Sequence, residues 1–583
     1  MDIYNFKSAP AHTNFQLPFE LTGKAFGVWL LSLENSPSSE KAHQVLLAIQ
    51  SINTSSKLAI DKKSLLLVDI YKAMPAFLDP LKSSLLNSAI PLTPEEQFNI
   101  EYIVWIYAEL ANGFASCTSK KSNFATAQTF FYGLHSLITA YLHISAAYAT
   151  PYANFWKQSY LFYGLASNLE IQDLTIDEHG GHSNTINKAL KHLIALYHCD
   201  LHQFRPRAIF SLSTCVEKYT SLMLLEKKFS AKSPMHYSGL DLNTDTPPSN
   251  LKRLKKTKKS ALRFFSAFSA SIEINKNSSN DAQGGGILKS INRELIQQAS
   301  RSLCLQQKRQ FTRIVEQKEQ YGIMGLASVI QSLRNNSSLQ VRPQKGKIEN
   351  LDPRVAGGWS VPNLELVSEG YESLDVMKNL LNDSSFKKGN TAQAKKIFGS
   401  DNKKFTDTNV WNNNPESTAE SIQESLLNIS DSSIKGYKII FNTDNNSSKV
   451  QIGDIIGIKH NDTIEVGIIR RITQLTGHEV QLGIKLLALE SELAYISLPD
   501  HDAIYTWALF LPGIKALNSN DSVVFNDNRF QSGEFITLHR ADLKPQTGRL
   551  HNLLHLSSAA AHIEISNTPI LDRESVDNNG HFT

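Results

Sequence analysis

Cysteine is scarce in this 583-residue chain, which has four residues of this type and no CxxC pair. Disulfide scaffolds and zinc knuckles need cysteines at short, paired spacing, so the sequence argues against both. We expect Cys117, Cys199, Cys215 and Cys304 to be buried free thiols of a cytoplasmic protein. The first residues also lack a basic stretch followed by an apolar run, so no signal peptide is expected.

Long apolar runs and a strong net charge are missing as well. The most apolar segment, about residues 127–149, is interrupted by Gln128, His135 and His143, so we interpret it as a buried helix rather than a membrane span. The formal net charge of +4 is too small for a general attraction to nucleic acid or anionic membranes. Either partner would need a local basic patch.

Motifs of common enzymes are also absent from the sequence. It contains no P-loop, no dinucleotide glycine fingerprint, no Gly-x-Ser-x-Gly elbow and no HExxH, so we predict no enzymatic activity. His179 and His182, and the group His198, Cys199 and His202, match no common zinc spacing. Loop and helix-surface roles are therefore expected for these histidines, and no metal or cofactor is predicted.

Residues 1–229 show the hydrophobic spacing of amphipathic helices. Phe26, Trp29 and Leu33 stand at i, i+3 and i+7, which places them on one helix face. Thr93-Pro-Glu-Glu96 predicts a helix start with an N-cap, a proline at the first helical position and a capping box. Together these signals predict a helical bundle or an irregular, solenoid-like domain. Further helices are predicted at about 123–149, 153–167, 184–201 and 206–228.

The composition changes between residues 230 and 286. Pro247-Pro248 precedes seven basic residues between positions 252 and 263, then Phe264-Phe265 and a run rich in Asn, Ser and Gly. We predict a basic, flexible linker whose charges are solvated, in preference to a contact with nucleic acid or anionic lipid. Helical spacing returns over residues 287–335 and predicts a helical segment there.

Strand-like segments dominate the rest of the chain. We expect residues 336–490 to form a small antiparallel barrel with its first strand at 364–371 and a disordered surface insertion at about 382–421. Further strand signals predict a β-rich C-terminal extension over 491–583. The predicted fold class is therefore α+β with several domains. The remaining barrel strands are predicted at 450–458, 465–471 and 480–487.

A polar elbow stands out within this β region. Asp431, Ser433 and Gly436 fit the pattern Asp-x-Ser-x-x-Gly. A turn at Gly453 and Asp454, a Val-x-Ile-x-Arg strand and a Leu-Gly-Ile strand follow in order. This order resembles the PilZ domain, a bacterial receptor module for the second messenger cyclic di-GMP. The resemblance implies a PilZ-like antiparallel β-barrel in the C-terminal part of the chain.

The resemblance also implies a ligand site at the elbow. Asp431 would accept hydrogen bonds from guanine N–H groups, and Ser433 would donate or accept one. Gly436 would let a base or phosphate approach the backbone, because it has no Cβ atom. Cyclic di-GMP is thus the ligand expected from the family, and no further cofactor is implied.

An arginine arm completes the site in PilZ domains, where an upstream Arg-x-x-x-Arg stacks on guanine and binds phosphate. The planar guanidinium suits both tasks. Shortly before the expected first strand, Arg342 is the candidate for this arm, although a second arginine is missing there. Arg309 and Arg313 form a true Arg-x-x-x-Arg, but their helical spacing favours a solvated helix face.

Three hypotheses for function follow. The first is a cytoplasmic, non-enzymatic effector that binds cyclic di-GMP and couples binding to protein interactions of the helical domain. For such an effector the resemblance implies a role in motility, surface attachment or biofilm control. The second is a ligand-independent scaffold with a degenerate PilZ-like barrel. The third, nucleic-acid binding through the basic segment, predicts a steep salt dependence.

Overall fold

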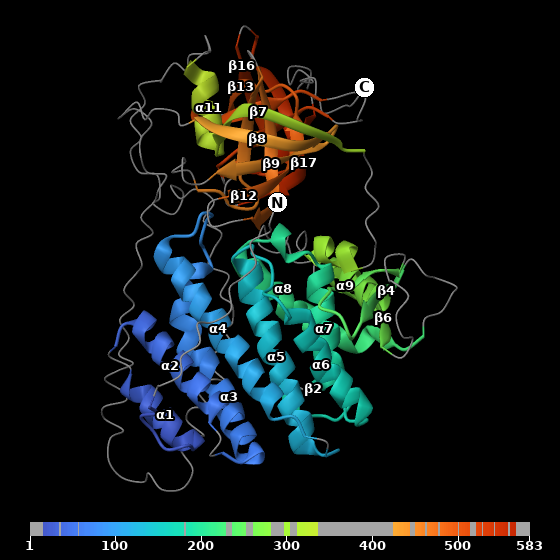
Figure 1. Cartoon of the computed structure of the whole chain (residues 1–583). Coiled ribbons are helices and arrows are strands. Elements are labelled where there is room, and N and C mark those ends of the chain that lie inside the picture. The colour runs from blue at the N-terminus through green and yellow to red at the C-terminus, as the bar shows by residue number, and fades with distance from the viewer. Residues whose placement is uncertain are drawn as a thin grey trace, which may run out of the picture. The chain divides into compact units, whose positions relative to one another are not determined.

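The computed structural model divides the chain into two compact units, a helical unit up to residue 308 and a β unit that starts at residue 309 (Figure 1). It describes residues 16–566 except 229–235, 252–260, 281–295, 304–311, 336–423 and several shorter gaps. The α+β multidomain class expected from the sequence is confirmed.

The helical unit is a bundle built around one central helix. Helix α5 (Phe124–Ala146) buries 18 of its 23 residues and contacts α3, α4, α6, α7 and α8. Such all-round burial explains why the sequence of this long helix is so apolar. The predicted capping box is confirmed, because the Thr93 hydroxyl accepts from the Glu96 amide and the Glu96 carboxylate accepts from the Thr93 amide. The other helices are α1 (Gly23–Ser32), α2 (Ser38–Thr54), α3 (Ile60–Leu85), α4 (Pro94–Ser116), α6 (Phe155–Asn168), α7 (Ile186–His198) and α8 (Pro206–Lys218), and β1 (Asp177–His179) pairs with β2 (His182–Asn184).

A helix and three of the four strands of a small sheet lie in the segment predicted to be a linker, and the remaining strand, β3, lies in the predicted helix 206–228. The sheet has the strand order β3-β6-β4-β5, and helix α9 follows its last strand. Phe265 and Ile274 are buried in the same core as the helical bundle, and Arg263 is buried with its guanidinium 5.8 Å from the Tyr163 ring. The prediction of a flexible linker is therefore wrong for residues 236–251 and 261–280, because these short strands pair across long sequence separations, whereas most of the basic run lies outside the described residues. The elements are β3 (Leu224–Glu226), β4 (Ser238–Asp241), β5 (Ser249–Asn250), β6 (Leu262–Ser266) and α9 (Phe268–Asn280).

The first barrel of the β unit is closed by six antiparallel strands in the order β10-β11-β12-β9-β8-β7. Its first strand is β7 (Ile314–Met324), in a segment predicted to be helical. Among the described residues, the helical prediction over 287–335 is confirmed for 296–303 and 326–335 and is wrong for β7. Most of β7 is exposed, so its sequence lacks the alternation of a half-buried strand. The expected strand at 364–371 and the insertion at 382–421 lie outside the described residues. The other strands are β8 (Glu424–Ser433), β9 (Gly436–Asn442), β10 (Ile455–His460), β11 (Thr463–Gln474) and β12 (Glu479–Ala488).

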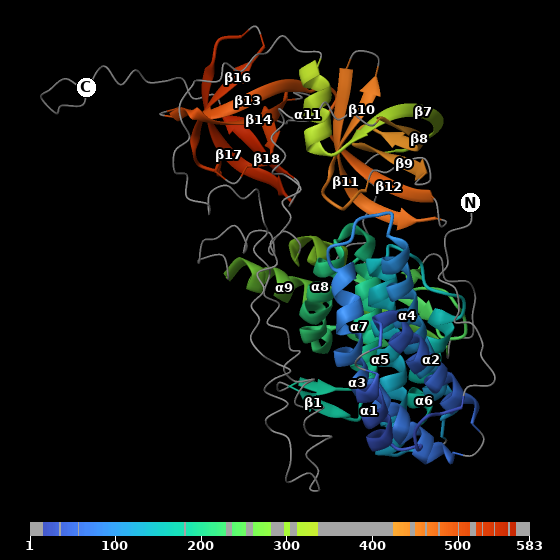
Figure 2. The same cartoon turned by 90° about the vertical axis from the view of Figure 1, so that its left-hand side faces the viewer.

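The predicted C-terminal extension is a second closed barrel of six antiparallel strands, in the order β13-β14-β15-β18-β17-β16. Helix α11 (Leu326–Asn335) follows β7 and contacts strands of both barrels, as Figure 2 shows. Among the helices that the structure describes, none has the length and apolar character that crossing a bilayer requires. The strands are β13 (Glu492–Leu498), β14 (His501–Leu511), β15 (Ser522–Phe525), β16 (Phe535–Arg540), β17 (Gln546–Leu556) and β18 (Ala561–Ser566).

Candidate functional site

The polar elbow is a tight hairpin between β8 and β9. Ser433 pairs with Gly436 across a turn of two residues, Ile434 and Lys435. The Ser433 hydroxyl donates to the Gly436 carbonyl oxygen at 3.1 Å, which fixes the turn. The hairpin therefore explains the spacing of the motif. Ser433 and Gly436 are the last paired residues before the turn, and Asp431 lies two positions before Ser433.

Gly436 is required by the barrel itself. Its φ is +153°, and a Cβ atom at this position would lie 1.9 Å from the carbonyl oxygen of Ile484 in β12. No other residue type fits without moving the backbone of the neighbouring strand. The absence of a side chain here therefore lets two strands come together, independently of any ligand.

Asp431 lies between two irregularities of the sheet. The pairing of β8 with β9 shifts register between Ile429 and Asp431, and the pairing of β7 with β8 shifts between Val315 and Lys318. In register, Val315 stands opposite Asp431. Bulges re-aim side chains and occur often beside functional sites, so this pair of shifts marks Asp431 as a specially placed residue.

The carboxylate of Asp431 has one paired and one unpaired oxygen. Arg313 donates from Nη1 to Oδ2 of Asp431 at 3.0 Å. The Asp431 side chain is only 16% exposed, and its Oδ1 is buried without a hydrogen-bond partner among the described residues. Because a buried acceptor without a donor is costly, this oxygen favours a ligand that brings an N–H group.

Arg313 does not lie on a helix face, in contrast to the prediction from its spacing. It directly precedes β7, the first strand of the barrel, and it ends the Arg309-Gln-Phe-Thr-Arg313 motif that helical spacing assigned to a solvated helix face. Its side chain is 42% exposed, so the guanidinium has further donors directed to solvent. Arg309 and the sequence-based candidate Arg342 lie outside the described residues.

Apolar side chains flank this charged pair. Val315 is 84% exposed and Ile434 is 67% exposed, and Ile314 is exposed too. Their exposure is unusual for large aliphatic residues on adjoining segments. The site therefore combines an unpaired acceptor, an arginine with free donor capacity and uncovered apolar surface, which together suit a planar, anionic molecule with N–H donors.

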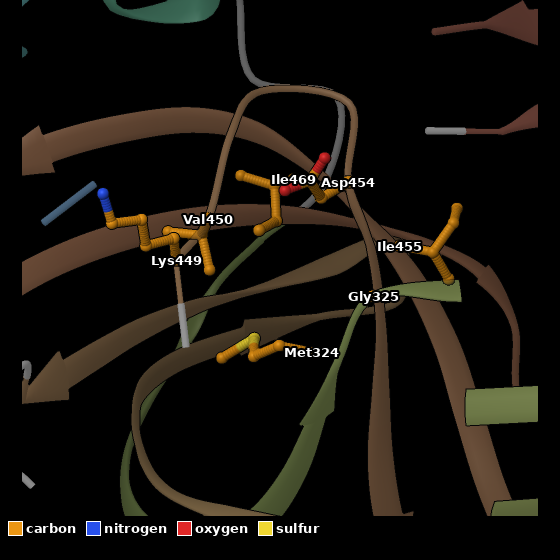
Figure 3. A pocket seen from close by; sticks show the side chains of 7 residues that line it. All are labelled: Met324, Gly325, Lys449, Val450, Asp454, Ile455 and Ile469. Atoms are coloured by element: carbon orange, nitrogen blue, oxygen red, sulfur yellow. The ribbon is translucent and has the colours of Figure 1, made fainter. Parts of the chain in front are cut away.

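A cavity of about 190 Å³ lies at the Gly453-Asp454 turn of the same barrel. Figure 3 shows Met324, Val450 and Ile469 around the same space. Pockets for drug-sized ligands usually have volumes of roughly 300–1,000 Å³, so this cavity is too small for a whole cyclic dinucleotide. The elbow surface is therefore the better candidate site.

Two of the histidines considered as metal ligands, His198 and His202, have other partners. His198 bonds through Nε2 to the Ser238 hydroxyl at 2.8 Å, and His202 bonds through Nε2 to the Ala149 carbonyl at 3.1 Å. Burial lowers the pKa of His198 to about 4, so the ring stays neutral. No group of three or more metal-ligating side chains is found in the part of the chain that the structure describes.

Comparison with protein families finds two matches. Residues 24–231 match the N-terminal domain of the cyclic-di-GMP receptor FimW, and residues 240–492 match the middle PilZ domain of the same receptor. The two ranges follow one another and together take in most of the chain. The second includes β7 to β12, α11 and the elbow, and it ends where β13 begins. No curated protein matches this sequence at a significant level.

Proposed function

The chain belongs to the family of the cyclic-di-GMP receptor FimW and is a cyclic di-GMP-binding effector, and we propose that the dinucleotide binds where Arg313 meets Asp431. The observation that supports this site is the unpaired, buried Oδ1 of Asp431 beside an arginine that precedes the first barrel strand. PilZ modules are in general binding modules rather than enzymes, and we propose a non-enzymatic role here.

The chemistry of cyclic di-GMP fits these side chains. Guanine presents N–H donors that Asp431 Oδ1 would accept, and the two phosphates need cationic donors. Arg313 would stack its guanidinium on a base and bind a phosphate oxygen with its free donors. Ser433 lies two residues after Asp431 and would add a hydroxyl at the same hairpin. Arg309, the first arginine of the Arg-x-x-x-Arg motif that Arg313 ends, is proposed as the second arginine of the arm.

Exposed aliphatic residues would hold the faces of the bases. Val315 stands opposite Asp431 in the sheet, and Ile434 is at the tip of the elbow hairpin. Covering both side chains with a guanine ring would remove apolar surface from water, which contributes about 25 cal/mol per Å². This contribution would be added to the polar contacts, which set the orientation of the ligand.

Ligand binding would exchange one partner of Asp431 for another. A partly exposed ion pair such as Arg313 with Asp431 contributes about 0–1 kcal/mol to stability, so a ligand can rearrange it at little cost. We propose that this rearrangement changes the protein interactions of the helical unit, through a difference in ligand affinity between two arrangements. Because the ligand is a cytoplasmic second messenger, the cytoplasm is the proposed location.

Calorimetric titration of the full chain with cyclic di-GMP tests the site. Arg313→Ala and Asp431→Ala should each weaken binding by roughly 10- to 150-fold, the equivalent of about 1.5–3 kcal/mol for a hydrogen bond to a charged group. Arg313→Lys should recover only part of the loss, because lysine lacks the planar fork. Arg540→Ala is the matched control, since Arg540 pairs with Glu492 on the second barrel at 3.5 Å and should not affect binding.

The outcomes separate the alternatives. No heat from the unchanged protein at tens of micromolar would refute the binding function and leave the ligand-independent scaffold. A loss in Arg342→Ala but not in Arg313→Ala would move the arm to the sequence-based candidate. Binding that is insensitive to Asp431→Ala would keep the ligand and move the site away from the elbow.

A further inference from the structure

The two barrels have the same topology. Numbered along the chain within each barrel, the strands follow one another around the ring as first, second, third, sixth, fifth and fourth in both. The first barrel realises this order with β7, β8, β9, β12, β11 and β10, and the second with β13, β14, β15, β18, β17 and β16. All the pairings given for both are antiparallel, so the likeness extends to strand direction.

The turn before the fourth strand of the first barrel has a distinctive set of hydrogen bonds. Gly453 has φ +89°, and its amide donates to the Ile469 carbonyl at 2.8 Å. The Ile469 amide donates back to the Asp454 carbonyl at 2.9 Å. The Asp454 carboxylate accepts from the Gln451 amide at 2.7 Å. The Asp454 amide completes the turn by donating to the Gln451 carbonyl at 3.2 Å.

The second barrel repeats these four hydrogen bonds before its own fourth strand, with Glu534 in the place of Asp454. Gly533 has φ +100°, and its amide donates to the Leu550 carbonyl at 2.6 Å. The Leu550 amide donates back to the Glu534 carbonyl at 2.9 Å, and the Glu534 carboxylate accepts from the Gln531 amide at 2.7 Å. The Glu534 amide donates to the Gln531 carbonyl at 3.2 Å. A shared strand order alone could arise by chance. The same four hydrogen bonds in the turn before the fourth strand indicate that the two barrels are copies of one fold.

The second copy lacks the elements of the ligand site. Residues 489–491, which precede its first strand, are Leu, Glu and Ser, so no arginine corresponds to Arg313. Its second and third strands are joined by residues 512–521 instead of a two-residue turn, and no Asp-x-Ser-x-x-Gly occurs there. Within this connection the Asp521 carboxylate is already engaged, because it accepts from the Gly513 amide at 2.8 Å.

The second copy instead packs against the first through α11. Leu326 and Val329 of α11 share one apolar core with Leu509 and Val524 of the second barrel. At the end of α11 the Arg334 guanidinium lies 5.1 Å from the Trp507 ring of β14, a cation–π contact. Because α11 directly follows β7, this core ties the second barrel to the strand that Arg313 directly precedes.

We propose that residues 492–566 are a second copy of the PilZ-like barrel that has no cyclic di-GMP site and that supports α11 and β7 of the first copy. The statement on cyclic di-GMP rests on the proposed function, whereas the supporting role does not. One dinucleotide site per chain follows, located on the first barrel alone.

Hydrogen exchange of the full chain, read by peptide, tests the supporting role. Leu509→Ala removes a fully buried side chain from the shared core, so exchange should rise at least tenfold in residues 323–335 as well as in β14. Ile536→Ala is the control, because Ile536 is equally buried but lies outside the shared core, and it should affect β16 more than residues 323–335. Leu509→Val should give the same pattern, at least threefold, if Leu509→Ala does not fold. Unchanged exchange at 323–335 while β14 exchange rises would overturn the supporting role.

Titration with cyclic di-GMP tests the missing site. Arg313→Ala and Asp431→Ala combined in one chain should leave no saturable binding. Residual binding that is lost on a further change in the second barrel, such as Arg549→Ala, would show that the second copy has kept a site. If the unchanged protein binds no ligand at all, the proposed function fails, and the exchange experiment still decides the role of the second barrel.

Discussion

Replacing Gly436 by alanine should destabilise the first barrel strongly. The new Cβ atom would lie 1.9 Å from the Ile484 carbonyl oxygen, and this neighbour is backbone that is held in the pairing of β12 with β9. A residue with a side chain is also strained at φ +153°. We estimate about 1–3 kcal/mol for the strained backbone and about 1–3 kcal/mol for overpacking. The sum, about 2–6 kcal/mol, is a large share of a typical stability of about 5–15 kcal/mol.

Gly325→Ala is the matched control for this prediction. Gly325 also has a positive φ, +85°, but no atom lies within 4 Å of the added Cβ atom, so only the strain should be felt. Hydrogen exchange of β8, β9 and β12 is the suitable assay, because a chain with several units need not unfold in two states. Gly436→Ala should exchange at least tenfold faster than Gly325→Ala in these strands. Equal effects of the two substitutions would refute the steric argument.

The remaining predictions concern stability in the two units. Thr93→Ala removes the N-cap of α4 and should cost about 0.5–2 kcal/mol, seen as a lower thermal midpoint of the helical signal. Gly27→Ala should stabilise α1 by about 0.5–1 kcal/mol, since the added Cβ atom meets nothing within 4 Å; a lower midpoint would contradict this. Burial lowers the pKa of His562 in the second barrel to about 3, whereas an unfolded histidine titrates near about 6.5. Between pH about 3 and about 6.5, the unfolded chain binds more protons at this residue than the folded chain does. The contribution of His562 to stability is therefore fully present above pH about 6.5 and is lost as the pH falls toward about 3. His562→Gln should flatten this dependence in urea unfolding of β13–β18, and an unchanged slope would assign it to other groups.

Local signals in the sequence were sufficient for most helices. The start of α4 is set by Thr93 and Glu96, which bond to each other's backbone within one turn. The elbow is local as well, since Ser433 bonds to Gly436 three positions further on, and the Asp454 carboxylate likewise accepts from the Gln451 amide within its own turn. These are the features that the resemblance to PilZ domains depended on, and the family comparison bears that resemblance out.

The sequence misassigned segments whose structure depends on distant partners. Strand β7 has few buried residues, and it becomes a strand because β8 and β10 pair with it on both sides. Strand β6 is held between β3 and β4 in the same way, within a segment whose basic composition indicates a linker. Neither pairing leaves a periodic pattern in the chain, so spacing alone could not reveal them.

The sequence by itself determined most of the helices, the tight elbow turn and the presence of the Asp431, Ser433 and Gly436 motif, because each depends on residues a few positions apart. Only the tertiary structure decided which arginine meets that motif. Arg313 and Asp431 are 118 positions apart, and the closure of the barrel by β7 and β8 brings them within 3.0 Å. It also decided that the C-terminal strands close into a second barrel, since ring closure joins strands through contacts that no local pattern encodes.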